Sequence, residues 1–367
     1  MAMSTRSLAI AADPDFARLE KVLRRQGEPD RVPFCELFSN IQDDVLRALG
    51  AWQEPPPPDA PLADREAHAW RQHIAYMTAL GYDYINCGAY GFGFPKNENP
   101  RGMTPQGERA YYLASSRTIT DRADFQAYPW PDMDAVDYTP FERIADFLPD
   151  RMKVISGGPG GVLENAMWLL GYEGISYLLY EDEPLVRDVF DAIGSRMALH
   201  IERVAAQATV GAIMLGDDLG FRTQTLLSPA ALRTYVFPWH TRIVEAAHRH
   251  GKPAILHACG NLTEVMDDII ACGWDARHSF EDAIEPVWEA KARYGDRIAL
   301  IGGFDMDKIS RSTVDQVREH TRLLVERCAP GGGWALGTGN SVANYVPVDN
   351  FLAMLEEGFR IGTYTTT

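Results

Sequence analysis

Residues 253–261 of the chain, Pro-Ala-Ile-Leu-His-Ala-Cys-Gly-Asn, are the stretch from which the fold can be worked out. An apolar run leads to His257 and Cys259, and Gly260 and Asn261 then favour a turn. Because side chains alternate along an extended segment, residues two apart face the same side. We therefore expect a β-strand whose C-terminal end presents an imidazole and a thiol together. Such a pair supplies half of a zinc site, although a buried histidine beside a small apolar cysteine gives the same pattern.

Similar short apolar runs recur on both sides of this stretch and alternate with longer segments of helical pattern. The two clearest helical segments are Leu185–Ala208 and Pro229–His250, and Ser228 is expected to cap the second. Eight strands are predicted: Val32–Phe38, Tyr82–Gly88, Lys153–Gly157, Ala212–Asp218, Pro253–Cys259, Trp274–Ser279, Ile298–Gly303 and Trp334–Gly337. Eight β–α alternations favour an α/β fold of the (β/α)8 TIM-barrel type. A doubly wound sheet is the rival, but no Gly-x-Gly-x-x-Gly follows the first strand.

The predicted barrel forms a single domain over residues 30–367, preceded by an N-terminal extension over residues 1–29. An insert at about residues 89–133 interrupts the alternation. This insert is rich in Gly, Pro, Asn and aromatic residues, and we expect it to cross the mouth of the barrel.

The composition indicates a globular protein and limits the binding partners and the cellular compartment that can be expected. The 367 residues are 46% hydrophobic and 23% charged, which is ordinary for a globular protein with a sizeable core. The net charge of −16 argues against a nucleic-acid partner, because phosphate binding needs a basic face. No apolar run is long enough to predict a membrane span. The five widely spaced cysteines predict a reducing, cytoplasmic compartment and no disulfide framework.

The C-terminal strand ends of such a barrel build its active site. Ionisable and polar residues gather there: Glu36, Asn40, Asn86, Asp217, Asp218, His257, Cys259, His278, Glu281, Asp305 and Asn340. Asp217 and Asp218 either cap the next turn or position a substrate, and Asp305 is either a helix N-cap or a substrate ligand. Asn40, Asn86, Tyr90 and Asn340 are further candidates for substrate binding. The glycines at 157–161 predict a tight turn more than a phosphate cradle, since no Walker lysine follows.

Several motifs together resemble the uroporphyrinogen decarboxylase superfamily. They are Asp-Arg-Val-Pro-Phe (30–34), Gly-Pro-Gly-Gly (158–161), Gly-Asp-Asp-Leu-Gly (216–220), Leu-Leu-Ser-Pro (226–229), His-Ala-Cys-Gly-Asn (257–261), Tyr-Gly-Asp-Arg-Ile (294–298), Gly-Gly-Phe-Asp (302–305) and Ala-Pro-Gly-Gly-Gly (329–333). The resemblance covers most of the chain and implies a (β/α)8 barrel.

The superfamily has two functional branches. Its decarboxylases carry Arg-Gln-Ala-Gly-Arg-Tyr after the first strand, and those arginines bind the carboxylates of the porphyrinogen. Here residues 35–44 read Cys-Glu-Leu-Phe-Ser-Asn-Ile-Gln-Asp-Asp, without arginine. Porphyrinogen decarboxylation is therefore disfavoured, because an octacarboxylate needs such a clamp.

The other branch consists of zinc-dependent methyltransferases that work with corrinoid proteins. Their His-x-Cys motif matches His257 and Cys259, but residues 337–340, Gly-Thr-Gly-Asn, lack the branch's third cysteine. Glu36, Cys35, His278 and Glu281 are the candidates to complete the metal shell. With Asp217 or Asp218 positioning substrate, the resemblance implies methyl transfer between a small O-methyl or thiol compound and a corrinoid cobalt, with zinc as Lewis acid.

Because no Asp-x-His-x-x-Gly segment occurs here, the cobamide is expected on a partner protein. The resemblance also allows a homodimer. Two alternatives stay open: a metal-free lyase acting on a carboxylated substrate, and a non-catalytic barrel that binds a tetrapyrrole or corrinoid.

Overall fold

Seven parallel strands form one sheet in the order of the chain. The computed structural model describes residues 8–11, 13–37, 39–96 and 117–364. The strands in this part of the chain are β1 (Tyr84–Asn86), β2 (Lys153–Ser156), β3 (Val210–Gly216), β4 (Ala254–His257), β5 (Ala276–His278), β6 (Ala299–Ile301) and β7 (Trp334–Ala335). Each of them overlaps a predicted strand, so seven of the eight predicted strands are confirmed, although β3 begins and ends two residues before its prediction. Their side chains are almost all buried, as expected for strands covered on both faces.

The segment predicted as the first strand, Val32–Phe38, is not a regular strand. Phe34 forms an isolated parallel bridge with Leu336, just beyond β7. Toward β1, the Tyr84 hydroxyl bonds to both the amide nitrogen and the carbonyl oxygen of Glu36, at 2.8 and 2.7 Å. Pro33 has no amide hydrogen to give to a ladder. A bridge and one tyrosine therefore link this segment to β7 and β1, and Phe38 lies outside the described residues.

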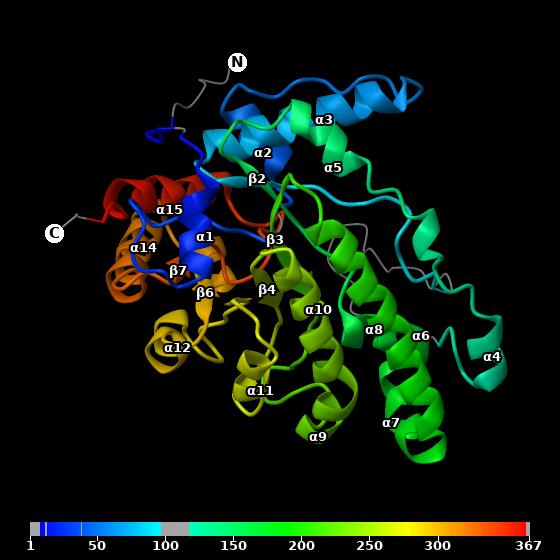
Figure 1. Cartoon of the computed structure of the whole chain (residues 1–367). Helices are drawn as coiled ribbons and strands as arrows, with labels where there is room; N and C mark the ends of the chain where they lie inside the picture. The colour runs from blue at the N-terminus through cyan, green and yellow to red at the C-terminus, as the bar shows by residue number, and fades with distance from the viewer. Residues whose placement is uncertain (1–7, 12, 38, 97–116, 365–367) are drawn as a thin grey trace.

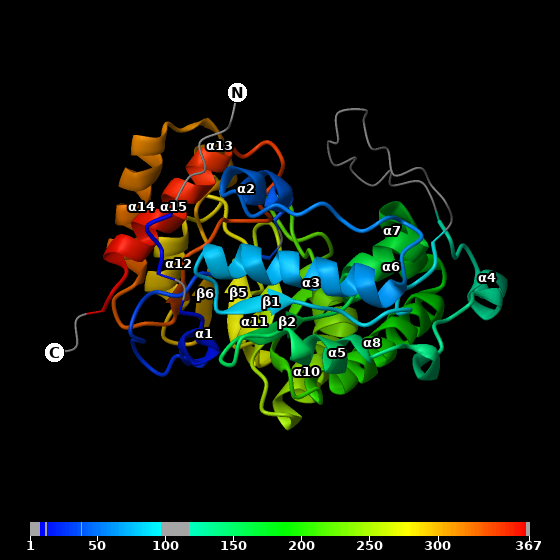
Figure 2. The same ribbon diagram turned by 90° about the horizontal axis from the view of Figure 1, so that it is seen from above.

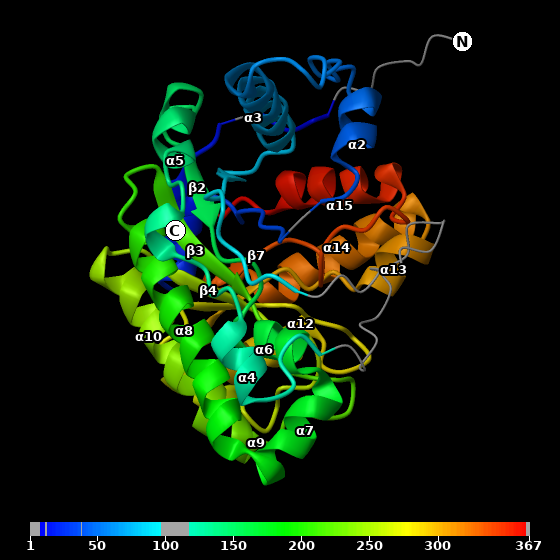
Figure 3. The same ribbon diagram turned by 90° about the vertical axis from the view of Figure 1, so that its right-hand side faces the viewer.

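Helices surround the strands (Figures 1 and 3). α8 and α10 pack together on one side of the sheet, and α14 and α15 pack together on the other. The described helices are α1 (Phe16–Leu23), α2 (Gln42–Ala48), α3 (Leu62–Ala79), α4 (Arg122–Ala127), η1 (Met133–Ala135), α5 (Pro140–Arg143), η2 (Ile144–Asp146), α6 (Val162–Leu170), α7 (Tyr172–Glu181), α8 (Glu183–Ala205), α9 (Pro229–Ala231), η3 (Leu232–Val236), α10 (Phe237–Arg249), α11 (Met266–Ala271), α12 (Val287–Tyr294), α13 (Met306–Arg311), α14 (Val314–Cys328) and α15 (Val348–Ile361).

The predicted helix Pro229–His250 is divided into α9, a π-helical turn (η3) and α10. Ser228 caps its start as predicted, since its hydroxyl accepts from the amide of Ala231 at 3.2 Å. Pro238 near the start of α10 cannot donate a backbone hydrogen bond, which favours the irregular turn before it.

α1 covers the N-terminal ends of the strands. Its Phe16 ring occupies the space that a side chain at Gly211, near the start of β3, would need. The amide of Phe16 donates to Arg151, just before β2, and buried Arg18 pairs with buried Asp83, just before β1. α1 thus closes this end of the barrel. In Figure 2, α1 lies across the strands from α6 and α7.

The flanks of the predicted insert pack against α8. Phe92 stacks on His200 of α8, with ring centroids 4.3 Å apart. Trp130 packs edge-on to Phe94 and lies under the guanidinium of Arg196. Phe94 belongs to the main hydrophobic core, and Phe92 and Trp130 pack against it. Residues 97–116 lie outside the described residues, so the expected path of the insert across the barrel mouth stays a prediction. Among the described helices, none has the length and apolar character needed to cross a bilayer.

Candidate metal centre

Three potential ligand side chains converge beyond the C-terminal ends of β3 and β4. His257 is the last residue of β4, Cys259 follows two residues later, and Asp218 follows β3. Their donor atoms all lie within 4.8 Å of one another, and they form the one such group among the described residues. Cys259 Sγ is 3.5 Å from His257 Nε2, which is 3.7 Å from Asp218 Oδ1. The amide of Cys259 donates to Asp218 Oδ1 at 3.0 Å, which fixes the two loops together.

The proton positions of the neighbouring histidines follow from one carbonyl. His278 on β5 is paired in register with His257, and their Nδ1 atoms are 2.7 Å apart. His278 Nε2 is 3.1 Å from the carbonyl oxygen of Thr338, which can only accept, so His278 carries its proton on Nε2. Burial lowers the pKa of His278 to about 3, so the ring is neutral and its Nδ1 accepts from His257 Nδ1. A neutral His257 then directs its Nε2 lone pair toward Cys259 and Asp218.

The electrostatics of this group favour a cation. Burial, followed by the nearby Asp218 carboxylate, raises the pKa of the Cys259 thiol. Within the described part of the chain, the Asp218 carboxylate lies 3.7 Å from His257 Nε2 and forms no ion pair with a lysine or arginine. The Asp218 side chain is 39% exposed and that of His257 is 8% exposed, so the group opens to solvent on the Asp218 side. A thiol, an imidazole and a carboxylate thus converge where a cation would stabilise all three.

Two further side chains touch the Cys259 sulfur. The amide of Asn340 donates to it at 3.3 Å, and Ser279 Oγ lies 3.4 Å from it. Ser279 is buried and has a φ of 94°, a backbone conformation that residues other than glycine rarely adopt. Asn340 is one of the predicted substrate ligands, whereas Ser279 was not predicted; its position directly after β5 was the available signal.

Glu36 and His278 are not placed as metal ligands, which corrects two expectations. Both nitrogens of His278 are engaged, by His257 and by Thr338. Glu36 is buried with one carboxyl oxygen 2.8 Å from the amide of Thr338 and the other 2.5 Å from its hydroxyl. Burial raises the pKa of Glu36 to about 8. Instead, His278 contacts the ligand candidate His257, and Glu36 contacts Thr338.

Asp217 is a helix cap, which decides between the two alternatives stated for it and corrects its prediction as a residue that positions substrate. Its carboxylate accepts from the amides of Val162, Leu163 and Glu164 at the start of α6, at 2.9–3.1 Å, and it lies 2.8 Å from His240 Nε2. A side chain at Gly161 would overlap Asp217, which explains that glycine. This internal carboxylate occupies the α6 N-terminus, so the glycine-rich turn is no phosphate cradle.

Asp305 is also a cap, which corrects its prediction as a substrate ligand. One oxygen accepts from the amides of Asp307 and Lys308 at the start of α13, and the other accepts from the amide of Asp282. Glu281 is exposed and is not a member of the metal-competent group. Its pKa is raised by burial and by Asp305 and Asp218.

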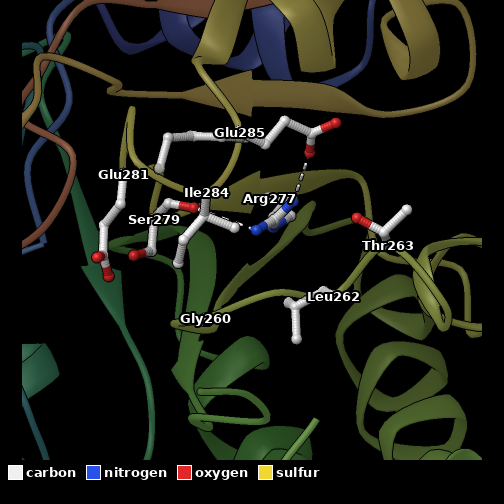
Figure 4. A pocket seen from close by; sticks show the side chains of 9 residues that line it. Gly260, Leu262, Thr263, Arg277, Ser279, Glu281, Ile284 and Glu285 are labelled. Atoms are coloured by element: carbon white, nitrogen blue, oxygen red, sulfur yellow. Dashed lines mark hydrogen bonds and ion pairs between the residues drawn. The ribbon is translucent and has the colours of Figure 1, made fainter. Parts of the chain in front are cut away.

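Glu281 lines a pocket beside the cluster (Figure 4), together with Gly260, Leu262, Thr263, Arg277, Ser279, Phe280, Ile284 and Glu285. Buried Arg277 points into this pocket and lies 3.8 Å from Glu285, which is also paired with Arg293 at 2.9 Å.

The remaining candidates make their contacts elsewhere. Asn40 is exposed and bonds through its backbone to Val342. Asn86 ends β1 beside His73, and Tyr90 pairs through its backbone with Asp137. The described residues show no contact between these three side chains and the cluster, so their substrate role stays a prediction.

Glu164, on the first turn of α6, also lies beside the cluster and was not among the predicted site residues. Its Oε1 accepts from the amide of Asp218 at 3.3 Å. Burial, together with the charges of Asp217 and Asp218, raises its pKa to about 8. Its place three residues after Gly161 was the available signal.

Comparison with known proteins places the chain in a family. A family model described as uroporphyrinogen decarboxylase (URO-D) matches residues 115–358. The chain belongs to this family. The resemblance inferred from the motifs is therefore confirmed.

Relatives within the uroporphyrinogen decarboxylase family include both functional branches. The chain is 22% identical over 346 residues to the methylcobamide:CoM methyltransferase MtaA of Methanosarcina barkeri, covering 90% of this chain and 94% of that protein. It is also 22% identical over 294 residues to the uroporphyrinogen decarboxylase of Methylibium petroleiphilum, covering 72% and 71%.

A solved methyltransferase from Methanosarcina mazei has the same fold, with a TM-score of 0.64 at 18% identity, over 93% of this chain and 97% of that chain. The predicted TIM-barrel fold is thus confirmed for the family domain.

Proposed function

We propose that this protein is a zinc-dependent methyltransferase that moves a methyl group between a small O-methyl or thiol compound and the cobalt of a corrinoid protein. The single observation that supports this proposal most is the convergence of His257, Cys259 and Asp218 at the open end of the barrel. The nearly full-length similarity to a methylcobamide:CoM methyltransferase supports the same reaction class.

The donor set fits zinc. An imidazole nitrogen, a thiolate sulfur and a carboxylate oxygen are all ligands that zinc accepts, and three protein ligands with an open position are typical of catalytic zinc. Asp218 would take the place of the missing third cysteine. When bound, zinc would supply Lewis acidity, which favours the thiolate of an acceptor or the departure of an alkoxide or phenoxide.

The chain's own residues hold and shape this site. The Asn340 amide donates to Cys259 Sγ and favours the thiolate, because a hydrogen bond to the charged form stabilises it. His278 orients His257, and the amide of Cys259 orients Asp218. An in-line methyl transfer needs placement and electrostatics more than proton transfer. The corrinoid of a partner protein would approach from the end opposite α1.

Elemental analysis tests this proposal. We expect about one zinc per chain in the purified protein and a large loss of zinc in His257→Ala. Glu357→Gln is the matched control, because Glu357 is equally buried among the arginines of α14 and α15, away from the cluster. The second measurement is the absorbance of a methylated corrinoid protein mixed with this enzyme and a thiol. Absence of metal from the wild type, with no demethylation of cobalt, would instead favour the metal-free lyase or the non-catalytic binding barrel.

A further inference from the structure

A chain of hydrogen bonds runs from Glu36 to both His257 and Cys259, and all of it passes through the segment from Thr338 to Asn340. Neighbouring backbone packs closely on both sides of Thr338. A side chain at Gly337 would lie 2.0 Å from the carbonyl oxygen of Cys35, and one at Gly339 would lie 2.1 Å from that of Phe280. Contacts this close leave no room for a side chain, so only glycine fits at positions 337 and 339.

One branch of the chain reaches the imidazole. The carbonyl of Thr338 accepts from His278 Nε2 at 3.1 Å, and His278 Nδ1 faces His257 Nδ1 at 2.7 Å. His278 and Thr338 are fully buried, so water does not compete for these bonds. The Thr338 carbonyl thus selects the tautomer of His278, which in turn selects the tautomer of His257.

The other branch reaches the thiol. Thr338 Oγ1 lies 2.5 Å from Glu36 Oε2 and 2.5 Å from the carbonyl oxygen of Asn340, whose side chain donates to Cys259 Sγ. A hydroxyl has one proton, and a carbonyl oxygen can only accept. Both short contacts are hydrogen bonds only if Thr338 donates to Asn340 and a protonated Glu36 donates to Thr338.

We infer that Glu36, as a neutral carboxylic acid, is a positioning residue that fixes His257 and Cys259 together through Thr338. The inference rests on the proposed metal site and adds a residue that acts at a distance from it. Glu36 comes from the irregular segment that links β7 to β1, so the point where the barrel closes is coupled to the site.

Three variants distinguish the effect of the Glu36 hydrogen bonds from the effect of side-chain volume. Glu36→Gln keeps an acceptor for the Thr338 amide and a donor for its hydroxyl, so it should bind Co²⁺ or Zn²⁺ within about threefold of wild type. Glu36→Met has a similar volume without the hydrogen bonds, and we expect affinity about 10- to 100-fold weaker, the usual cost of losing an outer-shell partner. Thr338→Val removes the hydroxyl branch and keeps the carbonyl branch, so its loss should be smaller. Glu357→Gln serves as the control and should bind like wild type.

The tautomers of the metal-free protein give a readout that is independent of the proposed function. Nitrogen-15 spectra of the imidazoles should show His257 protonated on Nδ1 and His278 on Nε2, in both wild type and Glu36→Gln. In Thr338→Val this pattern should persist, whereas Glu36→Met should mix the two forms. A wild-type His257 protonated on Nε2, or a Glu36→Met variant that binds metal and retains its tautomers like wild type, would overturn the inference. A wild type with the expected tautomers but no metal affinity would overturn the proposed function and leave the positioning role standing.

Discussion

At the scale of single residues, the site depends on groups whose charge differs from their ordinary state. Glu36 and Glu164 have pKa values raised to about 8 by burial, and His278 has a pKa lowered to about 3. All three are therefore neutral near pH 7, behind a cluster that contains the Asp218 carboxylate. The charged member of the metal-competent group, Asp218, lies on the solvent side. The neutral side chains behind the group orient its members through hydrogen bonds without adding charge.

The neutral state of Glu36 predicts a pH-dependent stability. Its pKa rises from 4.5 to about 8 on folding, so the folded state holds the proton more tightly. The stability that this contributes is fully present below pH 4.5 and is lost as the pH rises to about 8. The glutamine in Glu36→Gln does not titrate. Between pH 5 and 8 the free energy of unfolding of wild type should therefore fall relative to that of Glu36→Gln, by on the order of a few kcal/mol. Denaturant unfolding at several pH values measures this difference. A constant difference across the range would contradict a buried neutral acid at this position.

At the scale of elements, α6 and the loop after β3 depend on adjacent aspartates with different tasks. Asp217 faces the helix and satisfies three of its first amides, whereas Asp218 faces the cluster. Period-two alternation along a strand end puts neighbouring side chains on opposite sides. The pair therefore joins the start of α6 to the metal-competent group.

The two aspartates should respond oppositely to the same substitution. Asp217→Asn keeps the shape but removes the charge that three amides share, so we expect a loss of about 2–3 kcal/mol of stability with metal affinity nearly unchanged. Asp218→Asn should leave stability within about 1 kcal/mol of wild type, because the side chain is partly exposed, and should weaken zinc binding at least tenfold. Urea denaturation and a zinc titration of both variants test the assignment. Weakened zinc binding in Asp217→Asn alone would reverse the two roles.

Seven of the eight strands predicted from sequence periodicity are present, because each is a short apolar run that ends in turn residues. The convergence of His257 and Cys259 followed from their spacing on one such strand. The partners of these residues could not be predicted in the same way. Thr338 and Glu36 are 302 residues apart, and their contact arises from the closure of the barrel. Whether Asp217 or Asp218 faced the cavity depended on where α6 places its first turn, which no local pattern records.

At the scale of the whole molecule, one end of the barrel is closed by a helix and the other carries the candidate metal centre. α1 covers the N-terminal ends of the strands, and the metal-competent group lies beyond their C-terminal ends. The predicted N-terminal extension therefore includes a structural part of the barrel. Since nothing in α1 touches the cluster within the described residues, stability and chemistry should be separable by mutation.

Arg18 on α1 tests this separation. Its side chain is 4% exposed and pairs at 2.5 Å with fully buried Asp83, which Arg31 approaches less closely at 3.4 Å. Arg18→Met leaves Asp83 with a weaker partner, so we expect a loss of about 3 kcal/mol or more in the free energy of unfolding. Arg24→Met, at the C-cap of the same helix, removes a partly exposed pair with Glu20 and a hydrogen bond to the carbonyl of Gly251, and should cost about 1 kcal/mol or less. Zinc bound per folded chain should stay the same in both variants. Equal stability of the two variants, or zinc lost from folded Arg18→Met, would contradict the view that α1 stabilises the barrel without affecting the metal-competent group.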